Sequence, residues 1–185
     1  MTGPGGLPLL FLDVDGPLVP FGPRAGGHPV FPGAPGPPGP PEAGAHPLLD
    51  RIDPALGPRL AALRCEPVWA TTWGDEANAV VGPRLGLPRL RVVVWPASSD
   101  REERDMRAGL HWKTRTLVGW AAGRAFVWVD DEITERDRHW VAAHHGGPAL
   151  LRRVDPALGL TDADLRLIDI WLRRLAGGTA RGGMA

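Results

Sequence analysis

The sequence has no tyrosine, one cysteine and one lysine among its 185 residues. The single cysteine, Cys65, excludes an internal disulfide and a zinc site built from several cysteines. No apolar run approaches the ~20 residues that a membrane-spanning helix needs. The apolar stretch 7–12 follows no basic residue and runs directly into Asp13, unlike a signal peptide. We therefore expect a cytoplasmic protein with no membrane partner.

The sequence also lacks an excess of either charge, since 21 basic residues balance 21 acidic ones. This balance argues against a protein whose main task is to coat nucleic acid or an anionic membrane. Hydrophobic residues make up 43% and charged residues 23% of the chain, as in globular rather than disordered proteins. At this length we expect residues 1–185 to form a single domain with one core.

Lysine is the rarest charged residue, and Lys113 stands alone among the 21 basic residues. The abundance of Arg, Ala, Pro and Gly suggests a GC-rich genome, in which lysine drifts to arginine wherever either serves. A compact ammonium and a planar guanidinium are not interchangeable in a tight site. The retention of Lys113 therefore makes it a candidate functional residue.

Short apolar runs recur along the chain and predict strands. They cover residues 7–14, 68–71, 90–95, 125–129 and, more weakly, 149–154. Helical periodicity predicts helices over residues 54–64, about 75–81, 113–122 and 135–144, and a last helix capped by Thr161 and Asp164. Residues 98–107 are polar and are expected to form a solvated loop.

Strands that are apolar throughout and alternate with helices indicate a parallel sheet covered on both faces. We expect an α/β fold, a Rossmann-like three-layer sandwich with a mainly parallel sheet of about five strands. Between the first strand and the first helix, residues 20–47 consist largely of Pro and Gly and have no periodicity. This segment is predicted to be an ordered loop or a mobile polyproline-like flap.

Ligands of parallel sheets bind beyond the carboxyl ends of the strands. Three predicted strands end in acids or hydroxyls: Asp13 and Asp15, Thr71 and Thr72, and Asp130 and Asp131. Carboxylates this close repel one another, and a metal ion or an added proton relieves the repulsion. Carboxylate oxygens without Cys or His suit Mg²⁺. The alternative is that Asp13 and Asp15 only cap a turn and that Thr72 caps the next helix.

Other residues near this edge fit a bound phosphate. Lys113, at the start of a predicted helix, can hold a carboxylate and a phosphoryl oxygen together. The hydroxyls and backbone N–H groups of Thr71 and Thr72 can bind phosphate oxygens. Trp73 and Trp112 flank the predicted site and are candidates for contact with a substrate ring.

Four motifs occur in a fixed order: D-x-D-G after the first strand, Thr after the second, Lys before the fourth and Asp-Asp after it. The segments are LFLDVDGPL (residues 10–18), VWATTW (68–73), HWK (111–113) and VWVDDE (127–132). Together they resemble the haloacid dehalogenase (HAD)-like hydrolase superfamily, here as a small capless member. Pro17 stands where that family usually has Thr. The second and fourth segments also resemble a small bacterial subgroup associated with RNA-repair proteins.

The resemblance implies a Mg²⁺-dependent phosphatase. Asp13 would attack phosphorus and form an aspartyl-phosphate, and Asp15 would protonate the leaving oxygen and then activate water. Thr71, with Thr72 beside it, and Lys113 would bind the phosphoryl group. The implied metal ligands are Asp13, the backbone carbonyl of Asp15, and Asp130 with or without Asp131. An acid at position 15 favours a phosphatase over the dehalogenase and ion-pump branches, and the missing cap disfavours a phosphomutase.

Two alternatives share this fold. The first is a phosphatase that acts on nucleic-acid ends in RNA repair, for which Arg84, Arg89 and Arg91 could supply a basic strip. The second is a non-catalytic phosphate-binding or regulatory module, compatible with Pro17 and the missing cap. The partner is accordingly either a phosphorylated small molecule or a nucleic-acid end.

Overall fold

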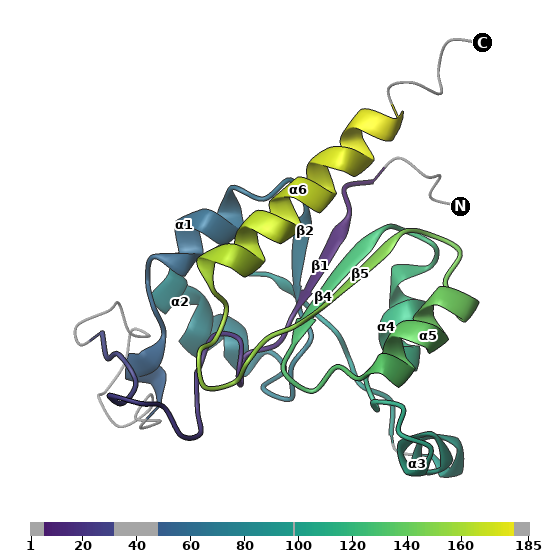
Figure 1. Ribbon diagram of the computed structural model, residues 1–185, viewed down its shortest axis with the longest axis horizontal. Coiled ribbons are helices and arrows are strands. Elements are labelled where there is room, and N and C mark those ends of the chain that lie inside the picture. The colour runs from purple at the N-terminus through teal and green to yellow at the C-terminus, as the bar shows by residue number, and fades with distance from the viewer. Residues whose placement is uncertain (1–5, 32–47, 98, 180–185) are drawn as a thin grey trace.

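The computed structural model describes residues 6–31, 48–97 and 99–179 (Figure 1). Its centre is a five-stranded sheet in the order β3-β2-β1-β4-β5, in which every pair is parallel. The strands are β1 (Leu9–Leu12), β2 (Glu66–Trp69), β3 (Arg91–Val92), β4 (Phe126–Asp130) and β5 (Ala149–Arg153). The first strand of the chain therefore occupies the middle of the sheet.

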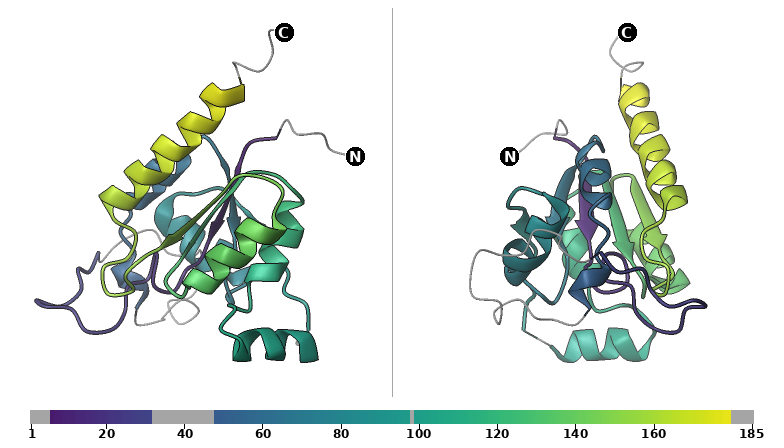
Figure 2. Two further views of the ribbon diagram at one scale, coloured as in Figure 1. Left: turned by 45° about the vertical axis from the view of Figure 1, so that its right-hand side comes forward. Right: turned by 90° about the vertical axis from the view of Figure 1, so that its left-hand side faces the viewer.

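Helices cover both faces of the sheet, which gives three layers (Figures 1 and 2). One face carries α1 (Leu56–Ala61), the π-helical turn η3 (Ala77–Val81), α2 (Gly82–Leu85) and α6 (Asp162–Thr179). The other face carries α4 (Thr114–Ala121) and α5 (Glu135–His144). A short 3-10 helix, η2 (Leu49–Arg51), precedes α1. The arrangement confirms the predicted α/β Rossmann-like fold.

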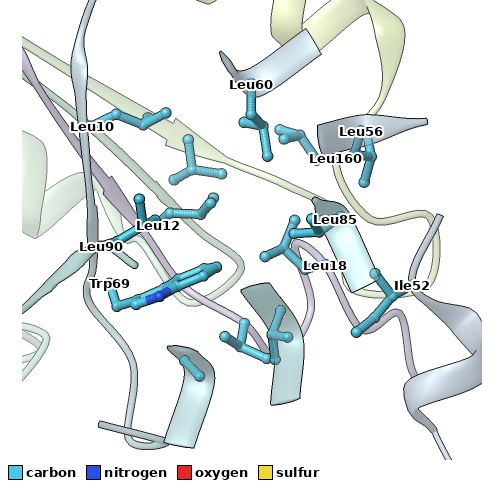
Figure 3. Packing of buried hydrophobic residues seen from close by; sticks show 14 of the residues in the cluster. Leu10, Leu12, Leu18, Ile52, Leu56, Leu60, Trp69, Leu85, Leu90 and Leu160 are labelled. Atoms are coloured by element: carbon cyan, nitrogen blue, oxygen red, sulfur yellow. The ribbon is translucent and has the colours of Figure 1, made fainter. Parts of the chain in front are cut away.

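The central strand β1 is apolar at every position because both of its faces are covered. Leu10 and Leu12 point into the core under α1, α2 and α6, whereas Leu9 and Phe11 point into the core under α4 and α5. All four side chains are fully buried. Successive strand residues face opposite sides, so a strand covered on both faces needs apolar residues at every position. Figure 3 shows the first of these cores.

Three strands are shorter than the sequence predicts, of which β5 lacks only the last predicted residue, Val154. Only Arg91–Val92 pairs with β2, although the apolar run extends over residues 90–95. β3 lies at the edge of the sheet, and Val94 is 82% exposed beyond its end, just before Pro96. In the central strand, pairing of β1 begins at Leu9 and ends at Leu12, within the predicted 7–14. In these strands the apolar run is longer than the hydrogen-bonded ladder.

The prediction of a loop over residues 98–107 is wrong, because Asp100–Arg107 forms helix α3. The segment is rich in Arg and Glu, which are good helix formers, and lacks Gly and Pro after Pro96. Arg115 of α4 makes two hydrogen bonds to Asp105, one at 2.9 Å, and so joins α3 to the sheet domain. In Figure 1, α3 lies apart from the three layers, below α4 and α5.

The last two helices begin with the same capping arrangement. Thr161 and Asp164 cap α6 reciprocally: Asp164 Oδ2 accepts the Thr161 N–H at 2.8 Å, and Thr161 Oγ1 accepts the Asp164 N–H at 3.3 Å. This cap is confirmed as predicted. Thr134 and Asp137 form an equivalent capping box at the start of α5. Such a box satisfies backbone donors that a helix leaves unpaired at its N-terminus.

The described part of the Pro- and Gly-rich segment has no helix or strand. Residues 20–31 form a loop that is attached at Phe21, whose N–H donates to Pro156 O at 2.9 Å. Arg51 Nη1 donates to Pro20 O at 2.9 Å. The rest of the predicted flap, residues 32–47, lies outside the described residues. Among the described helices, none has both the length and the apolar character required to cross a membrane.

Candidate functional site

Asp13 directly follows β1, at the carboxyl end of the central strand. Its backbone N–H donates to Val129 O at 3.2 Å and so extends the pairing of β1 with β4. The residue is 8% exposed. Its Oδ1 accepts the backbone N–H of Val14 at 2.8 Å. The position of Asp13 is therefore set by the buried centre of the sheet.

The chain turns sharply after this residue. Val14 O accepts the N–H of Val19 at 2.9 Å, and Gly16 has a φ of 83°. A Cβ at Gly16 would lie 2.7 Å from Cγ of Asp131, closer than a side chain can approach. Glycine at this position therefore allows both the turn and its close contact with the carboxylate that follows β4.

Lys113 joins the ends of β1 and β4. Its Nζ lies 2.5 Å from Asp13 Oδ2 and 2.9 Å from Asp130 Oδ2. Lys113 is 3% exposed and Asp130 is fully buried. Because Lys113 immediately precedes α4, the first turn of that helix places its ammonium between the two carboxylates. Three residues that were identified separately in the sequence are thus in direct contact.

A third carboxylate completes this group. Asp13, Asp130 and Asp131 each offer an oxygen, and these oxygens lie within 4.8 Å of one another. Asp130 is held by two further donors: the Glu132 N–H at 2.9 Å from Oδ1 and the Trp128 indole N–H at 3.2 Å from Oδ2. Carboxylate oxygens are the ligands that hard cations such as Mg²⁺ prefer, so the chemistry of this donor set fits a divalent cation of that kind.

Burial strongly affects the charges of the group. Burial raises the pKa of Asp13 to about 7 in spite of the opposing charge of Lys113, and the charge of Asp130 adds to the rise. Burial and the charge of Asp130 raise the pKa of Asp131 to about 6. The pKa of Asp130 lies below its usual range because Lys113 outweighs the effect of burial. One ammonium thus cannot neutralise three carboxylates, and the group favours an added proton or cation.

The side chain of Asp15 lies outside the three-carboxylate group. Its Oδ2 accepts the indole N–H of Trp73 at 2.9 Å. Trp73 is half-buried in the loop after β2 and packs against the core. The loop after β2 therefore orients the Asp15 carboxylate.

Thr71 and Thr72 follow β2, next to the end of β1. Thr71 is fully buried; its Oγ1 accepts the Trp73 N–H at 3.4 Å and its carbonyl accepts the Trp95 indole N–H at 2.9 Å. Thr72 is exposed. Thr72 does not cap the next helix, the alternative to a phosphate-binding role, since Glu76 occupies the N-cap of η3 without a side-chain cap. Both threonines lie at the predicted edge, with Thr71 the more firmly positioned.

Asp137 is a site-forming residue that the sequence analysis missed. It is fully buried, and its Oδ1 accepts the His111 N–H at 2.8 Å and the Thr114 hydroxyl at 2.6 Å. Its Oδ2 accepts the Thr134 N–H at 2.8 Å. Asp137 therefore fixes the turn that carries Lys113. The pattern T-x-x-D at residues 134–137 predicts a helix cap, but nothing local in the sequence predicts its contacts with residues 111–114.

Aromatic side chains surround the same turn. The rings of Trp95 and Trp112 meet edge to face, with centroids 4.7 Å apart, and Lys113 Nζ lies 5.5 Å from the Trp112 ring. The His111 ring stacks on Trp112 with centroids 5.7 Å apart. Trp112, a candidate for substrate contact, is therefore packed against neighbours on the protein itself.

Comparisons with protein-family models, with curated proteins and with solved structures found no match to this chain.

Proposed function

We propose that this chain is a Mg²⁺-dependent phosphomonoester hydrolase of the HAD-like kind, which acts through an aspartyl-phosphate on Asp13. One observation carries the proposal: Asp13, at the end of the central strand, shares the buried Lys113 with Asp130 and offers an oxygen within 4.8 Å of one from Asp131. Phosphoryl transfer requires positioning and charge neutralisation more than special side-chain chemistry, and this group supplies both.

Each side chain has a defined part in the proposed reaction. The Asp13 carboxylate attacks phosphorus, the bond between phosphorus and the leaving oxygen breaks, and Asp15 gives that oxygen its proton. In the second step Asp15 takes a proton from water, and the water oxygen attacks the phosphorus of the aspartyl-phosphate. The bond between phosphorus and Asp13 breaks, which releases inorganic phosphate and regenerates the Asp13 carboxylate. Bound Mg²⁺ would neutralise charge on the phosphoryl oxygens.

Lys113 and Thr71 bind the transferring group in this scheme. Lys113 is the only cation in direct contact with Asp13 among the described residues, and its short carboxylate contacts fix its ammonium beside the nucleophile. Burial strengthens such contacts because little water screens them. Thr71 lies at the adjacent strand end, so its backbone and hydroxyl are near the same edge.

The alternative of a nucleic-acid end phosphatase receives no additional support from the surface. Two of the three arginines of the possible basic strip pair with acids: Arg89 with Asp75 at 2.8 Å and Arg91 with Glu66 at 2.9 Å. A strip that binds phosphates electrostatically requires unpaired positive charge. We therefore favour a phosphorylated small molecule as substrate over a nucleic-acid end.

Two measurements on the same proteins test the proposal. The first is Mg²⁺-dependent hydrolysis of p-nitrophenyl phosphate by the wild type, by Asp13→Asn and by Asp50→Asn, whose carboxylate is exposed and serves as a matched control. The second is thermal unfolding with Mg²⁺, with and without beryllium fluoride, which mimics an aspartyl-phosphate. A ligand that binds only the native state raises the melting temperature.

The expected result is hydrolysis and a beryllium fluoride shift in the wild type and in Asp50→Asn, with both lost in Asp13→Asn. A shift without hydrolysis of any phosphomonoester favours the non-catalytic binding module. Preferential hydrolysis of 3′- or 5′-phosphorylated oligonucleotides over sugar phosphates favours the end phosphatase. Absence of both signals in the wild type refutes the proposal.

A further inference from the structure

The contact between Trp73 and Asp15 joins two loops that meet only in the fold. Trp73 follows β2 and Asp15 follows β1, and the indole Nε1 lies 2.9 Å from Asp15 Oδ2. The backbone N–H of Trp73 donates to Thr71 Oγ1 at 3.4 Å. One tryptophan thus contacts both the proposed acid–base residue and a proposed phosphate-binding residue.

The chemistry of the indole group limits what Asp15 can do with each oxygen. An indole N–H donates and has no acceptor, so Oδ2 serves as an acceptor in this contact. The best acceptor is the oxygen that does not carry the proton, which directs the proton of a neutral Asp15 to Oδ1. The ring itself packs against the core, so the donor has a fixed position.

The indole N–H carries no formal charge. Asp15 Oδ2 accepts this neutral donor at 2.9 Å, whereas Asp13 Oδ2 contacts the ammonium of Lys113 at 2.5 Å. The two carboxylates are therefore held by different kinds of donor, and Trp73 orients Asp15 through a neutral hydrogen bond.

We propose that Trp73 is a positioning residue that holds Asp15 through Oδ2 and presents Oδ1 to the leaving-group oxygen. This inference rests on the proposed phosphatase function and adds a residue to it. Because Trp73 acts through Asp15, loss of the Trp73 indole affects proton donation by Asp15 more than it affects substrate binding. The effect therefore depends on how much the leaving group needs a proton.

The test compares kcat/KM for two leaving groups in the wild type and in Trp73→Phe, which keeps a ring but loses the N–H. kcat/KM includes only the steps up to departure of the leaving group. Glycerol phosphate has an alkoxide leaving group that needs a proton, whereas p-nitrophenolate leaves without one. Trp171→Phe is the matched control, since Trp171 of α6 packs half-buried against the same core.

We expect Trp73→Phe to lower kcat/KM for glycerol phosphate roughly 10- to 100-fold, part of what a general acid contributes, and to change that for p-nitrophenyl phosphate less than about threefold. In an Asp15→Asn background the same substitution should have no further effect on either substrate. The indole resonance of Trp73 in a ¹H–¹⁵N spectrum should also move in Asp15→Asn, which tests the contact without Trp73→Phe.

Equal losses for both substrates, an additive loss in the Asp15→Asn background or an unmoved indole resonance each overturn the positioning role. In those cases an active wild type leaves the phosphatase function intact. A wild type that hydrolyses neither substrate refutes the phosphatase function, and the role of Trp73 fails with it.

Discussion

The pKa of Asp13 predicts that the proposed nucleophile destabilises the metal-free protein. Its rise from 3.8 to about 7 results from burial and, in smaller part, from the nearby Asp130 charge. One pKa unit corresponds to about 1.4 kcal/mol, so ionisation of Asp13 in the native state is unfavourable by about 4 kcal/mol relative to the unfolded chain. We therefore expect Asp13→Asn to be more stable than the wild type at pH 8 in the presence of a chelator.

The gain is smaller than the full cost of ionisation. Asp13 accepts hydrogen bonds on both oxygens, from Val14 N–H on Oδ1 and from Lys113 on Oδ2. An asparagine amide must turn its NH₂ group towards one of these donors, at a cost of about 1–2 kcal/mol. The net gain expected at pH 8 is about 2–3 kcal/mol, or roughly 4–12 °C in melting temperature for a chain of this length.

The gain should depend on pH in a defined direction. Well below pH 3.8, the ordinary pKa of this carboxyl, Asp13 is protonated in both states and contributes no difference. As the pH rises towards 7, the unfolded chain releases this proton while the native protein keeps it, so the stability of the wild type falls relative to Asp13→Asn. Well above pH 7, Asp13 is ionised in both states and the difference is constant.

Urea unfolding across pH 4–8 in a chelator measures this difference, with the exposed Asp50→Asn expected within about 0.5 kcal/mol of the wild type. Saturating Mg²⁺ at about 100 times its Kd should then restore about 2.7 kcal/mol to the wild type and leave Asp13→Asn nearly unchanged. An Asp13→Asn protein that is less stable than the wild type at pH 8 without metal would refute the reasoning from burial.

Further predictions concern three buried positions. Asp137→Ala removes the carboxylate that orients the Lys113 turn and should lower the free energy of unfolding by about 3 kcal/mol in a urea titration; a loss below 1 kcal/mol contradicts its role. Gly16→Ala, at a φ of 83° and against Asp131, should abolish the Mg²⁺-dependent thermal shift, and an unchanged shift would show that the turn tolerates a side chain. Burial raises the pKa of the Cys65 thiol to about 12, so iodoacetamide at pH 8 should label Cys65 only when the protein unfolds. Mass spectrometry measures the labelling, and rapid labelling of the native protein would contradict the burial of Cys65.

The sequence predicted those parts of the fold that depend on local pattern. Apolar runs located all five strands, and most clearly β1 and β4, because a strand buried on both faces has no polar alternation. The predicted edge was found as well, since parallel strands end on one side and acids follow β1 and β4. The motifs place Asp13, Lys113 and Asp130 near the ends of neighbouring strands, and in the structure Lys113 contacts both carboxylates.

Contacts between distant segments were not predictable in this way. Trp73 reads as a possible substrate contact, yet its indole N–H is directed at Asp15, on a loop that follows another strand. The role of Asp137 beside His111 likewise depends on how α5 packs next to the start of α4. Helix α3 was missed because its charged residues have no apolar stripe, although their helix propensity is high.

The site has a consequence for how the chain folds. The Lys113–Asp13 ion pair joins residues 100 positions apart, so it forms only after a long loop has closed. β1 also pairs only with strands that follow it in the sequence, because both of its neighbours, β2 and β4, come later in the chain. Contacts of such high sequence separation slow folding and form late. When the protein refolds, binding of a phosphate analogue should therefore recover later than the helical signal. Recovery of binding then reports formation of the native state.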